Sequence, residues 1–450
     1  MAGEMEIEII RRETIKPSTP TPHHLQSYKL CLLDQLGPVA YGPLVLFYPN
    51  NKAITTHQRS QHLKKSLSEA LTLFYPLAGT VLSDNNSIQC IDDGAHFIEA
   101  RVHGLLANFL HNPDSELLHR FLPIEIESTK AGNGPVFLVQ ASFFDCGGLA
   151  VGTCFAHKIG DATTLRAFLK SWSAIARGHG HEVVPHFGTA SRFPPRDHFP
   201  FQRPSMLPVD KIKNVTKRFV FHASKMEALK AKVSSASVPN PTRVEAATAL
   251  LWRSAMAAWR SSNKGIAKHS ALTHAVNIRK WVQPPLPEST IGNLITFLAA
   301  RTDNQVENQR DIKGLVAEMR KGKKKFTETQ ANRLGGESTF ETMLEFMKEL
   351  AEMMGKYDMN RLTCTSLCNF GLYGTDFGWG KPIWVTTPTP SSKNLAMIID
   401  TRDGGGVDMW LCLTQEDMAL FERDPELLEF ASPNPSLLLP DEPPKWTAAL

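Results

Sequence analysis

Hydrophobic positions along this chain recur with two different periods, and each period predicts one kind of secondary structure. Short runs that are apolar throughout, or that alternate with polar residues, predict β-strands. These runs are 7–15, 45–50, 136–140, 217–222 and 271–278. Longer segments with apolar residues every three or four positions predict amphipathic helices. These segments are 58–74, 162–176, 224–233, 242–259, 311–325 and 340–356.

Strand-like and helix-like segments are mixed in both halves of the chain, which predicts an α/β fold. Near the C-terminal end, the runs 395–400 and 407–413 flank the glycine-rich segment 403–406, which indicates a hairpin. The helix predicted from Thr242 has Glu245 three positions later, a pairing typical of a capping box at a helix start.

A connecting segment follows the first half of the chain. Between positions 178 and 208 glycine, proline and histidine are frequent and the periodicity is lost. His179, His181 and His186 leave a metal-binding tract open there, although a solvated loop is the favoured interpretation. The predicted division of the 450 residues is an N-terminal domain 1–177, a crossover linker 178–216 and a C-terminal domain 217–450.

Composition narrows the possible function classes. The 49 basic and 45 acidic residues nearly balance, whereas a nucleic-acid binder would show a basic stripe. No apolar run reaches the ~18 residues of a membrane span, and the acidic N-terminus lacks an apolar signal region. Seven cysteines, an odd number in apolar contexts, predict reduced core thiols. We expect a cytoplasmic protein without nucleic-acid or membrane partners.

One stretch carries candidate chemistry. His157 ends an apolar run and Asp161 follows four positions later, directly before the helical segment 162–176. Histidine can act as a general base near neutral pH, and a nearby aspartate can orient it or anchor its loop. Taken alone, the spacing favours a plainer interpretation, a histidine with backbone partners beside a helix-capping aspartate. The stretch supplies no third ligand, so no metal site is predicted.

A second motif, Asp376-Phe377-Gly378-Trp379-Gly380, changes this balance. H-x-x-x-D and D-F-G-W-G, in this order and at this separation, resemble the two signatures of the BAHD family of plant acyl-CoA-dependent acyltransferases. The resemblance runs from Lys16-Pro17 to the hairpin around Gly405 and is strongest for the vinorine synthase-like acetyltransferase branch. It implies two similar α/β domains with mixed sheets, as in chloramphenicol acetyltransferase, and a channel between them with the histidine at its middle.

The resemblance also implies roles for single residues. His157 would be the general base in a direct transfer from a thioester to a hydroxyl, without an acyl-enzyme. Asp161 would face away from the channel and pair with Arg279 in a structural role. The spacing alone leaves a His–Asp triad open, because positions i and i+4 share one face of a helix. Thr365 is the candidate oxyanion donor, although it equally suits packing in a strand, and Leu367 stands where the family has an indole donor.

For the second motif, the resemblance implies a structural role away from the chemistry. Its glycines allow tight turns, and Trp379 supplies a large buried anchor. The family's coenzyme A contacts correspond to Thr242 and Arg243, which begin a predicted helix. We add Asn293, in the glycine-marked segment 291–295, to these cofactor contacts. No permanently bound cofactor is expected, and acetyl-CoA would be a co-substrate.

These expectations combine into one predicted function. The chain would be an acyltransferase, a monomer, that moves acetyl from acetyl-CoA to a hydroxyl of a plant specialised metabolite, an alkaloid or terpenoid alcohol. One alternative is transfer of a longer or aromatic acyl group, or transfer to an amine. Another is a catalytically silent member that binds a metabolite, which the intact His157 disfavours.

Overall fold

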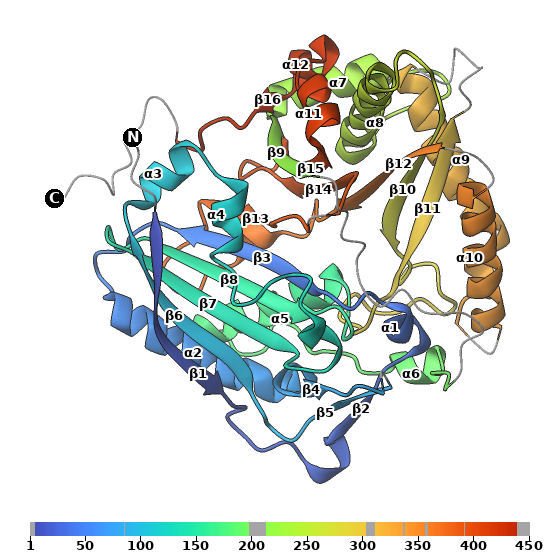
Figure 1. Cartoon of the computed structure of the whole chain (residues 1–450). Helices are drawn as coiled ribbons and strands as arrows, with labels where there is room; N and C mark the ends of the chain where they lie inside the picture. Colours follow the sequence, from blue (N-terminus) through green and yellow to red (C-terminus); the bar gives the residue numbers. More distant parts are fainter. Residues whose placement is uncertain are drawn as a thin grey trace.

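The computed structural model describes residues 5–84, 86–197, 213–302, 311–335, 338–355, 359–390 and 392–438. Positions 198–212 of the predicted linker and 439–450 of the predicted C-terminal domain lie outside these ranges. The remainder forms two large mixed sheets with helices, and Figure 1 shows the two sheets side by side in separate parts of the molecule. The predicted α/β class with mixed sheets is confirmed.

The first sheet has six strands and is built mostly from the N-terminal half. In spatial order its strands are β1 (Glu6–Ile15), β6 (Ala95–His103), β7 (Phe137–Phe144), β8 (Leu149–Ala156), β3 (Tyr41–Tyr48) and β13 (Trp384–Thr386). Only β6 and β7 pair in parallel; the other neighbours are antiparallel. Residues of β3, β7 and β8 are almost all buried, as expected of strands covered on both faces.

The second sheet has seven strands and comes from the C-terminal half. In spatial order they are β11 (Ile295–Thr302), β10 (His269–Asn277), β12 (Met359–Ser366), β14 (Leu395–Asp400), β15 (Val407–Thr414), β9 (Asn214–Phe221) and β16 (Ser432–Pro433). The predicted hairpin is the antiparallel pair β14 and β15. A small third sheet contains β2 (Ser27–Lys29), β5 (Ser87–Gln89) and β4 (Thr80–Val81).

Helices cover both large sheets. In chain order they are α1 (Leu32–Leu36), α2 (Thr56–Leu73), α3 (Leu106–His111), α4 (Ser115–His119), α5 (Ala162–Ala176), α6 (Thr189–Arg192), α7 (Ala223–Val233), α8 (Arg243–Ser262), α9 (Ile312–Thr329), α10 (Thr339–Gly355), α11 (Gln415–Phe421) and α12 (Pro425–Phe430). Short 3-10 turns occur at His23–Leu25, Tyr75–Ala78, Thr129–Gly132, Ala331–Arg333 and Leu372–Gly374. Helices α2 and α5 pack together behind the first sheet in Figure 1.

Local sequence signals explain where the long helices begin. Thr55 and Gln58 form a capping box at α2, and the predicted box of Thr242 and Glu245 is present at α8. Asp311 caps α9 by accepting from the Gly314 amide at 2.6 Å. Helix α9 extends to residue 329, four positions past the predicted end at 325. The short α12 and β16 were not predicted, because neither spans enough residues to show a period.

One strand crosses between the two halves. β13 belongs to the C-terminal half in sequence, yet it pairs antiparallel with β3 in the first sheet. Its Trp384 is fully buried and donates to Asp408 Oδ2 at 3.1 Å, and Asp408 forms a buried ion pair with Arg218. The Arg218 guanidinium lies 5.2 Å from the Trp384 ring centre. Trp384 belongs to the first sheet, whereas Asp408 and Arg218 belong to the second. The hydrogen bond from Trp384 to the buried ion pair therefore connects the two large sheets.

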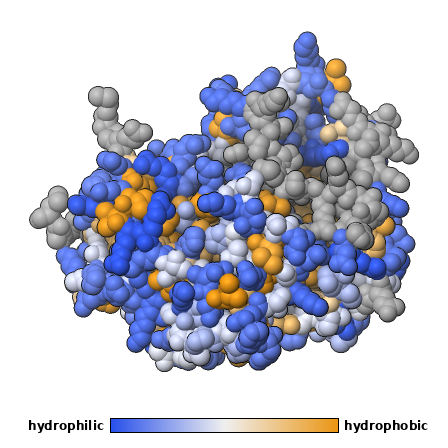
Figure 2. All heavy atoms as spheres, turned by 60° about the horizontal axis from the view of Figure 1, so that its bottom comes forward, coloured by the Kyte–Doolittle hydropathy of each residue, from blue (hydrophilic) through white to orange (hydrophobic). Residues whose placement is uncertain are grey.

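Three clusters of buried apolar side chains form the core. One fills the first sheet and its helices, one fills the second, and a smaller one joins α1, the segment around Ile278 and α9. Few large apolar side chains of the described residues are exposed, and the face in Figure 2 is mainly hydrophilic with separate hydrophobic patches. None of the helices in the described ranges has the length and apolarity needed to cross a bilayer.

Candidate active site

His157 lies directly after β8, in the turn that leads into α5. Its amide donates to the carbonyl of Ala40 at 2.9 Å, which ties the turn to the segment before β3. Asp161 then caps α5 by accepting from the amides of Thr163 and Thr164 at 3.0 and 3.1 Å. A buried strand on one side and a capped helix on the other therefore hold the imidazole in a fixed place.

Asn293 clamps the imidazole from the C-terminal half. Its Oδ1 lies 2.8 Å from His157 Nδ1, and its Nδ2 donates to the His157 carbonyl at 2.6 Å and to Asp34 Oδ1 at 3.1 Å. Because Nδ2 faces two acceptors, the amide orientation is determined, and Oδ1 must accept from a protonated Nδ1. The neutral ring therefore keeps its lone pair on Nε2, which is able to accept a proton.

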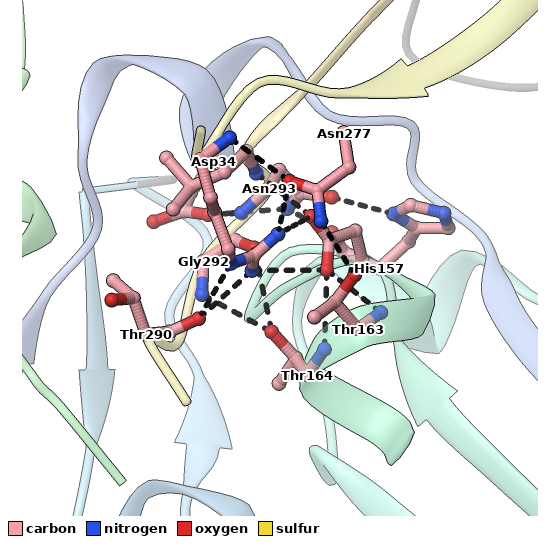
Figure 3. A network of polar contacts seen from close by, with 11 residues as sticks. Asp34, His157, Thr163, Thr164, Asn277, Thr290, Gly292 and Asn293 are labelled. Atoms are coloured by element: carbon pink, nitrogen blue, oxygen red, sulfur yellow. Dashed lines mark hydrogen bonds and ion pairs between the residues drawn. The ribbon is translucent and has the colours of Figure 1, made fainter. Parts of the chain in front are cut away.

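Asp34 supports this clamp from behind. Its Oδ1 accepts from the Asn293 amide at 2.7 Å, and its Oδ2 accepts from the Cys31 amide at 3.0 Å. Burial raises the pKa of Asp34 to about 6, against the opposing effect of these hydrogen bonds. The chain Asp34–Asn293–His157 joins α1, the segment before β11 and the turn after β8, with the imidazole at the edge of the network (Figure 3).

The surroundings keep His157 neutral. Burial lowers its pKa from the ordinary 6.5, and this effect exceeds the opposing influence of the Asn293 hydrogen bond and the Asp161 charge. The neighbouring Lys158 ammonium also lowers it. At neutral pH the imidazole is therefore unprotonated and able to accept a proton.

Asp161 and Arg279 form a buried, two-pronged ion pair. The guanidinium nitrogens lie 2.8 and 3.1 Å from the two carboxylate oxygens, and both side chains are almost inaccessible. Arg279 also donates to the carbonyls of Thr290 and Gly292, while the Leu294 amide donates to Asp161. With its oxygens engaged in this way, Asp161 makes no hydrogen bond to the His157 ring, whose Nδ1 contacts Asn293. This ion pair links the turn after β8 to the segment after β10 and so braces the two halves against each other.

A cavity of about 390 Å³ opens in front of the imidazole. Thr365, Ser366 and Leu367 at the end of β12 line it together with His157, so the structure brings the candidate base and the candidate oxyanion donor to one space. The remaining lining residues are Leu33, Leu36, Gly37, Pro38, Asp161, Ala162, Thr163, Ala275, Val276, Asn277, Asn293, Ile295, Thr296, Phe297, Met343, Phe346 and Phe370. Leu367 offers no polar atom there, as expected from its sequence.

The second motif does not contact this cavity. Asp376 Oδ1 accepts from the amides of Gly378 and Gly380 at 2.8 and 2.9 Å, which closes a tight turn with both glycines at positive φ. Phe377 is fully buried against Trp172, with ring centres 4.7 Å apart, and Trp379 also packs into the first core. These residues anchor the segment before β13 to the first sheet.

The residues expected to contact coenzyme A are distributed over two places. Thr242 and Arg243 border a polar hollow of about 670 Å³ at the start of α8. There the Arg243 guanidinium bonds to Asp400 at 2.9 Å and to Asn369 at 3.0 Å. Asn293 lies at the imidazole instead, with its side-chain amide occupied by Asp34 and His157.

Two features of the site were not predicted. Asp34 and the Asn293 clamp are contributed by segments far from His157 in sequence, and only the fold brings them together. The sequence did show Asp34 within an apolar stretch and Asn293 after a glycine, but neither signal specifies a partner. A polar residue in an otherwise apolar run is the one signal that points to a buried hydrogen bond.

The arrangement defines a class of enzyme. A neutral imidazole, whose Nε2 contacts no described side chain, faces a largely apolar cavity that Thr365 also lines, and the described lining residues include no cysteine. Cys154, three positions before the histidine, is fully buried, and burial raises the pKa of its thiol well above the ordinary value. Such a site suits direct group transfer to an acceptor hydroxyl by general-base catalysis.

Comparison with known proteins names the family. The model of the Transferase family matches residues 5–428. Epi-neemfruitin B 7-O-acetyltransferase of Melia azedarach is 37% identical over 462 residues, covering 96% of this chain and all of that protein. Vinorine synthase of Rauvolfia serpentina is 37% identical over 423 residues, covering 92% and 96%. The chain belongs to this family, the BAHD acyltransferases, and is an acyltransferase.

Solved structures agree with this assignment. The crystal structure of vinorine synthase has a TM-score of 0.83 and 35% identity, covering 96% of this chain and all of that one. A complex of the Fusarium graminearum protein TRI101 with coenzyme A and T-2 mycotoxin has a TM-score of 0.67 at 18% identity, which shows the shared fold.

Proposed function

We propose that this protein transfers acetyl from acetyl-CoA to a hydroxyl of a plant specialised metabolite. The observation that carries the proposal is the imidazole of His157, neutral and with Nε2 unoccupied by any described side chain, at a mainly apolar cavity large enough for a small molecule. Relatives over nearly the full length act as O-acetyltransferases by name, among them stemmadenine O-acetyltransferase of Catharanthus roseus.

In the proposed reaction, His157 is the general base and Thr365 the oxyanion donor. The acceptor hydroxyl hydrogen-bonds to His157 Nε2, which takes its proton as the oxygen attacks the thioester carbonyl. The developing oxyanion accepts a hydrogen bond from the Thr365 hydroxyl. The tetrahedral intermediate then collapses, the C–S bond breaks, and the proton held on Nε2 passes to the leaving thiolate. Acyl ester and free thiol are the products, and the imidazole returns to its neutral form.

The other site residues position these groups. Asn293 keeps the proton on Nδ1, and Asp34 holds the Asn293 amide in the orientation that does so. The Asp161–Arg279 pair fixes the turn that carries the imidazole to the segment between β10 and β11. The polar hollow at Thr242 and Arg243 receives the polar portion of coenzyme A. We propose further that the enzyme is cytoplasmic and acts as a monomer.

The test is a thiol-release assay with acetyl-CoA and a panel of alkaloid, terpenoid and simple alcohols. Acceptor-dependent thiol release by the wild type, lost in His157→Ala, is the expected result. His179→Ala is the matched control, because His179 is exposed and is not among the residues that line the cavity. Near-normal turnover by His157→Ala would refute the base assignment.

Two other results would revise the proposal. Turnover with benzoyl-CoA or a hydroxycinnamoyl-CoA, but none with acetyl-CoA, would keep the enzyme class and change the donor. Coenzyme A binding without turnover of any donor and acceptor would favour a member of the family that only binds metabolites.

A further inference from the structure

The cavity in front of His157 has walls of a distinct composition. Apolar side chains come from α1, from β10 and β11, and from α10, where Met343 and Phe346 face the space. The polar side chains of the lining, among them Asn277, Thr163 and Thr296, are uncharged apart from Asp161, since the His157 imidazole is neutral. A ligand enclosed here exchanges water mainly for hydrocarbon and aromatic surface.

The charges near the cavity offer nothing to a cation. Asp161, the one carboxylate among the described lining residues, is already bonded through both oxygens to Arg279. Lys158 adds a second positive charge close by, since its ammonium donates to the carbonyl of the lining residue Gly37 at 2.6 Å. Behind the Asn293 clamp, both oxygens of the buried Asp34 carboxylate already accept hydrogen bonds from Cys31 and Asn293. With Asp161 and Asp34 set against Arg279 and Lys158, the local charges balance and no carboxylate of the described lining is left unpaired.

One apolar residue of the cavity lining also reaches the protein surface. Phe297 on β11 lines the cavity and is 39% exposed, an unusual exposure for a phenylalanine and one of few among the described residues. Met343 and Phe346 lie in the same lining, on α10. β11 and α10 therefore contribute apolar groups to the cavity wall, one of which, Phe297, reaches the surface.

We propose that the acceptor is an uncharged, largely apolar alcohol of the terpenoid kind, and that the cavity discriminates against alcohols carrying a protonated amine. This inference rests on the proposed acetyl transfer. It selects terpenoid alcohols over alkaloid alcohols, the two acceptor classes named in the predicted function. The physical reason is desolvation: an ammonium group enclosed here loses its water and gains no free carboxylate. A neutral polycycle loses little and gains contact with the apolar walls.

The experiment uses two acceptors of the same shape. Tropine carries a protonated bridging amine at neutral pH, and 8-methylbicyclo[3.2.1]octan-3-ol replaces that nitrogen by carbon. With acetyl-CoA at pH 7, we expect kcat/KM for the carbocycle to exceed that for tropine by at least about tenfold. Raising the pH through the amine pKa of tropine should narrow the gap, because the neutral amine then enters. Equal values at pH 7, or a preference for tropine, would overturn the inference.

A pair of variants tests the cause. Met343→Glu places a carboxylate in the cavity wall, and Met343→Gln matches its size without the charge. The ratio of kcat/KM for tropine to that for the carbocycle should rise at least about tenfold in the glutamate variant relative to the glutamine variant. An unchanged ratio in two folded variants would show that missing negative charge is not what excludes the amine.

Binding separates this inference from the proposed function. Calorimetric titration of the wild type with each alcohol, in the presence of coenzyme A, reports affinity without requiring transfer. Tighter binding of the carbocycle would support the inference even if neither alcohol is acetylated, and the panel assay would then decide separately whether acetyl transfer occurs. Tighter binding of tropine would refute the inference whatever the enzyme catalyses.

Discussion

Removing the carboxylate of Asp161 should destabilise the protein far more than it changes the chemistry. Asp161→Ala leaves the Arg279 guanidinium buried with only carbonyl and amide oxygens as partners. Breaking a buried pair in this way costs about 3–5 kcal/mol. Loss of the α5 cap adds about 1 kcal/mol, since the Thr163 and Thr164 amides lose their acceptor. A domain is typically stable by only about 5–15 kcal/mol, so the loss is large.

Two further variants separate these contributions. Asp161→Asn keeps an oxygen that caps α5 but removes the negative charge. It should therefore lower the free energy of unfolding by about 1 kcal/mol less than Asp161→Ala does, because the helix cap is retained. Arg279→Met leaves the Asp161 carboxylate with three amide donors, from Thr163, Thr164 and Leu294. Combining Asp161→Asn with Arg279→Met should cost less than the sum of the two single changes, because the charges are coupled.

The assay is denaturant unfolding of each variant, followed by kcat/KM under conditions where the protein is folded. The midpoint of unfolding should fall clearly, while folded Asp161→Asn keeps substantial activity because Asp161 makes no hydrogen bond to the imidazole. A loss of kcat of several hundredfold, with an unchanged midpoint and unchanged coenzyme A binding, would refute the brace. It would restore the interpretation of His157 and Asp161 as part of a catalytic triad.

Three other changes have defined outcomes. Thr365→Val should lower kcat by about 10²–10³-fold without changing the midpoint of unfolding, whereas unchanged kcat would mean that Thr365 only packs in β12. The kcat/KM of the wild type should decline only below pH 6.5, because burial lowers the His157 pKa and the base is lost as pH falls through it. Asn293→Ala removes a hydrogen bond that raises the His157 pKa. In this variant kcat should be lower, and the acidic decline of kcat/KM should lie at lower pH than in the wild type; an unchanged pH profile would contradict the clamp. Gly378→Ala forces a side chain into positive φ and should cost about 1–3 kcal/mol in unfolding experiments with little effect on kcat/KM, whereas an unchanged midpoint would show that the turn tolerates it.

Much of the molecule could be predicted from local patterns. The helix predicted at 162–176 coincides with α5, because its apolar stripe and its capping aspartate both lie within the segment itself. The capping box of α8 and the hairpin of β14 and β15 follow for the same reason. The family could likewise be identified from two short motifs, since each is contiguous in sequence.

What the sequence did not determine depends on contacts between distant segments. The sequence of β13 does not indicate that this strand pairs with β3 in the first sheet. Strand pairing depends on the packing of neighbouring strands and on burial, which are properties of the tertiary structure. Asn293 was assigned to cofactor contact from its glycine-marked segment, while the fold places it 2.8 Å from an imidazole 136 positions away. The neutral state of His157, and the absence of a free carboxylate among the described residues of its cavity, arise from burial and charge pairing. Both depend on the three-dimensional surroundings, so only the tertiary structure decided them.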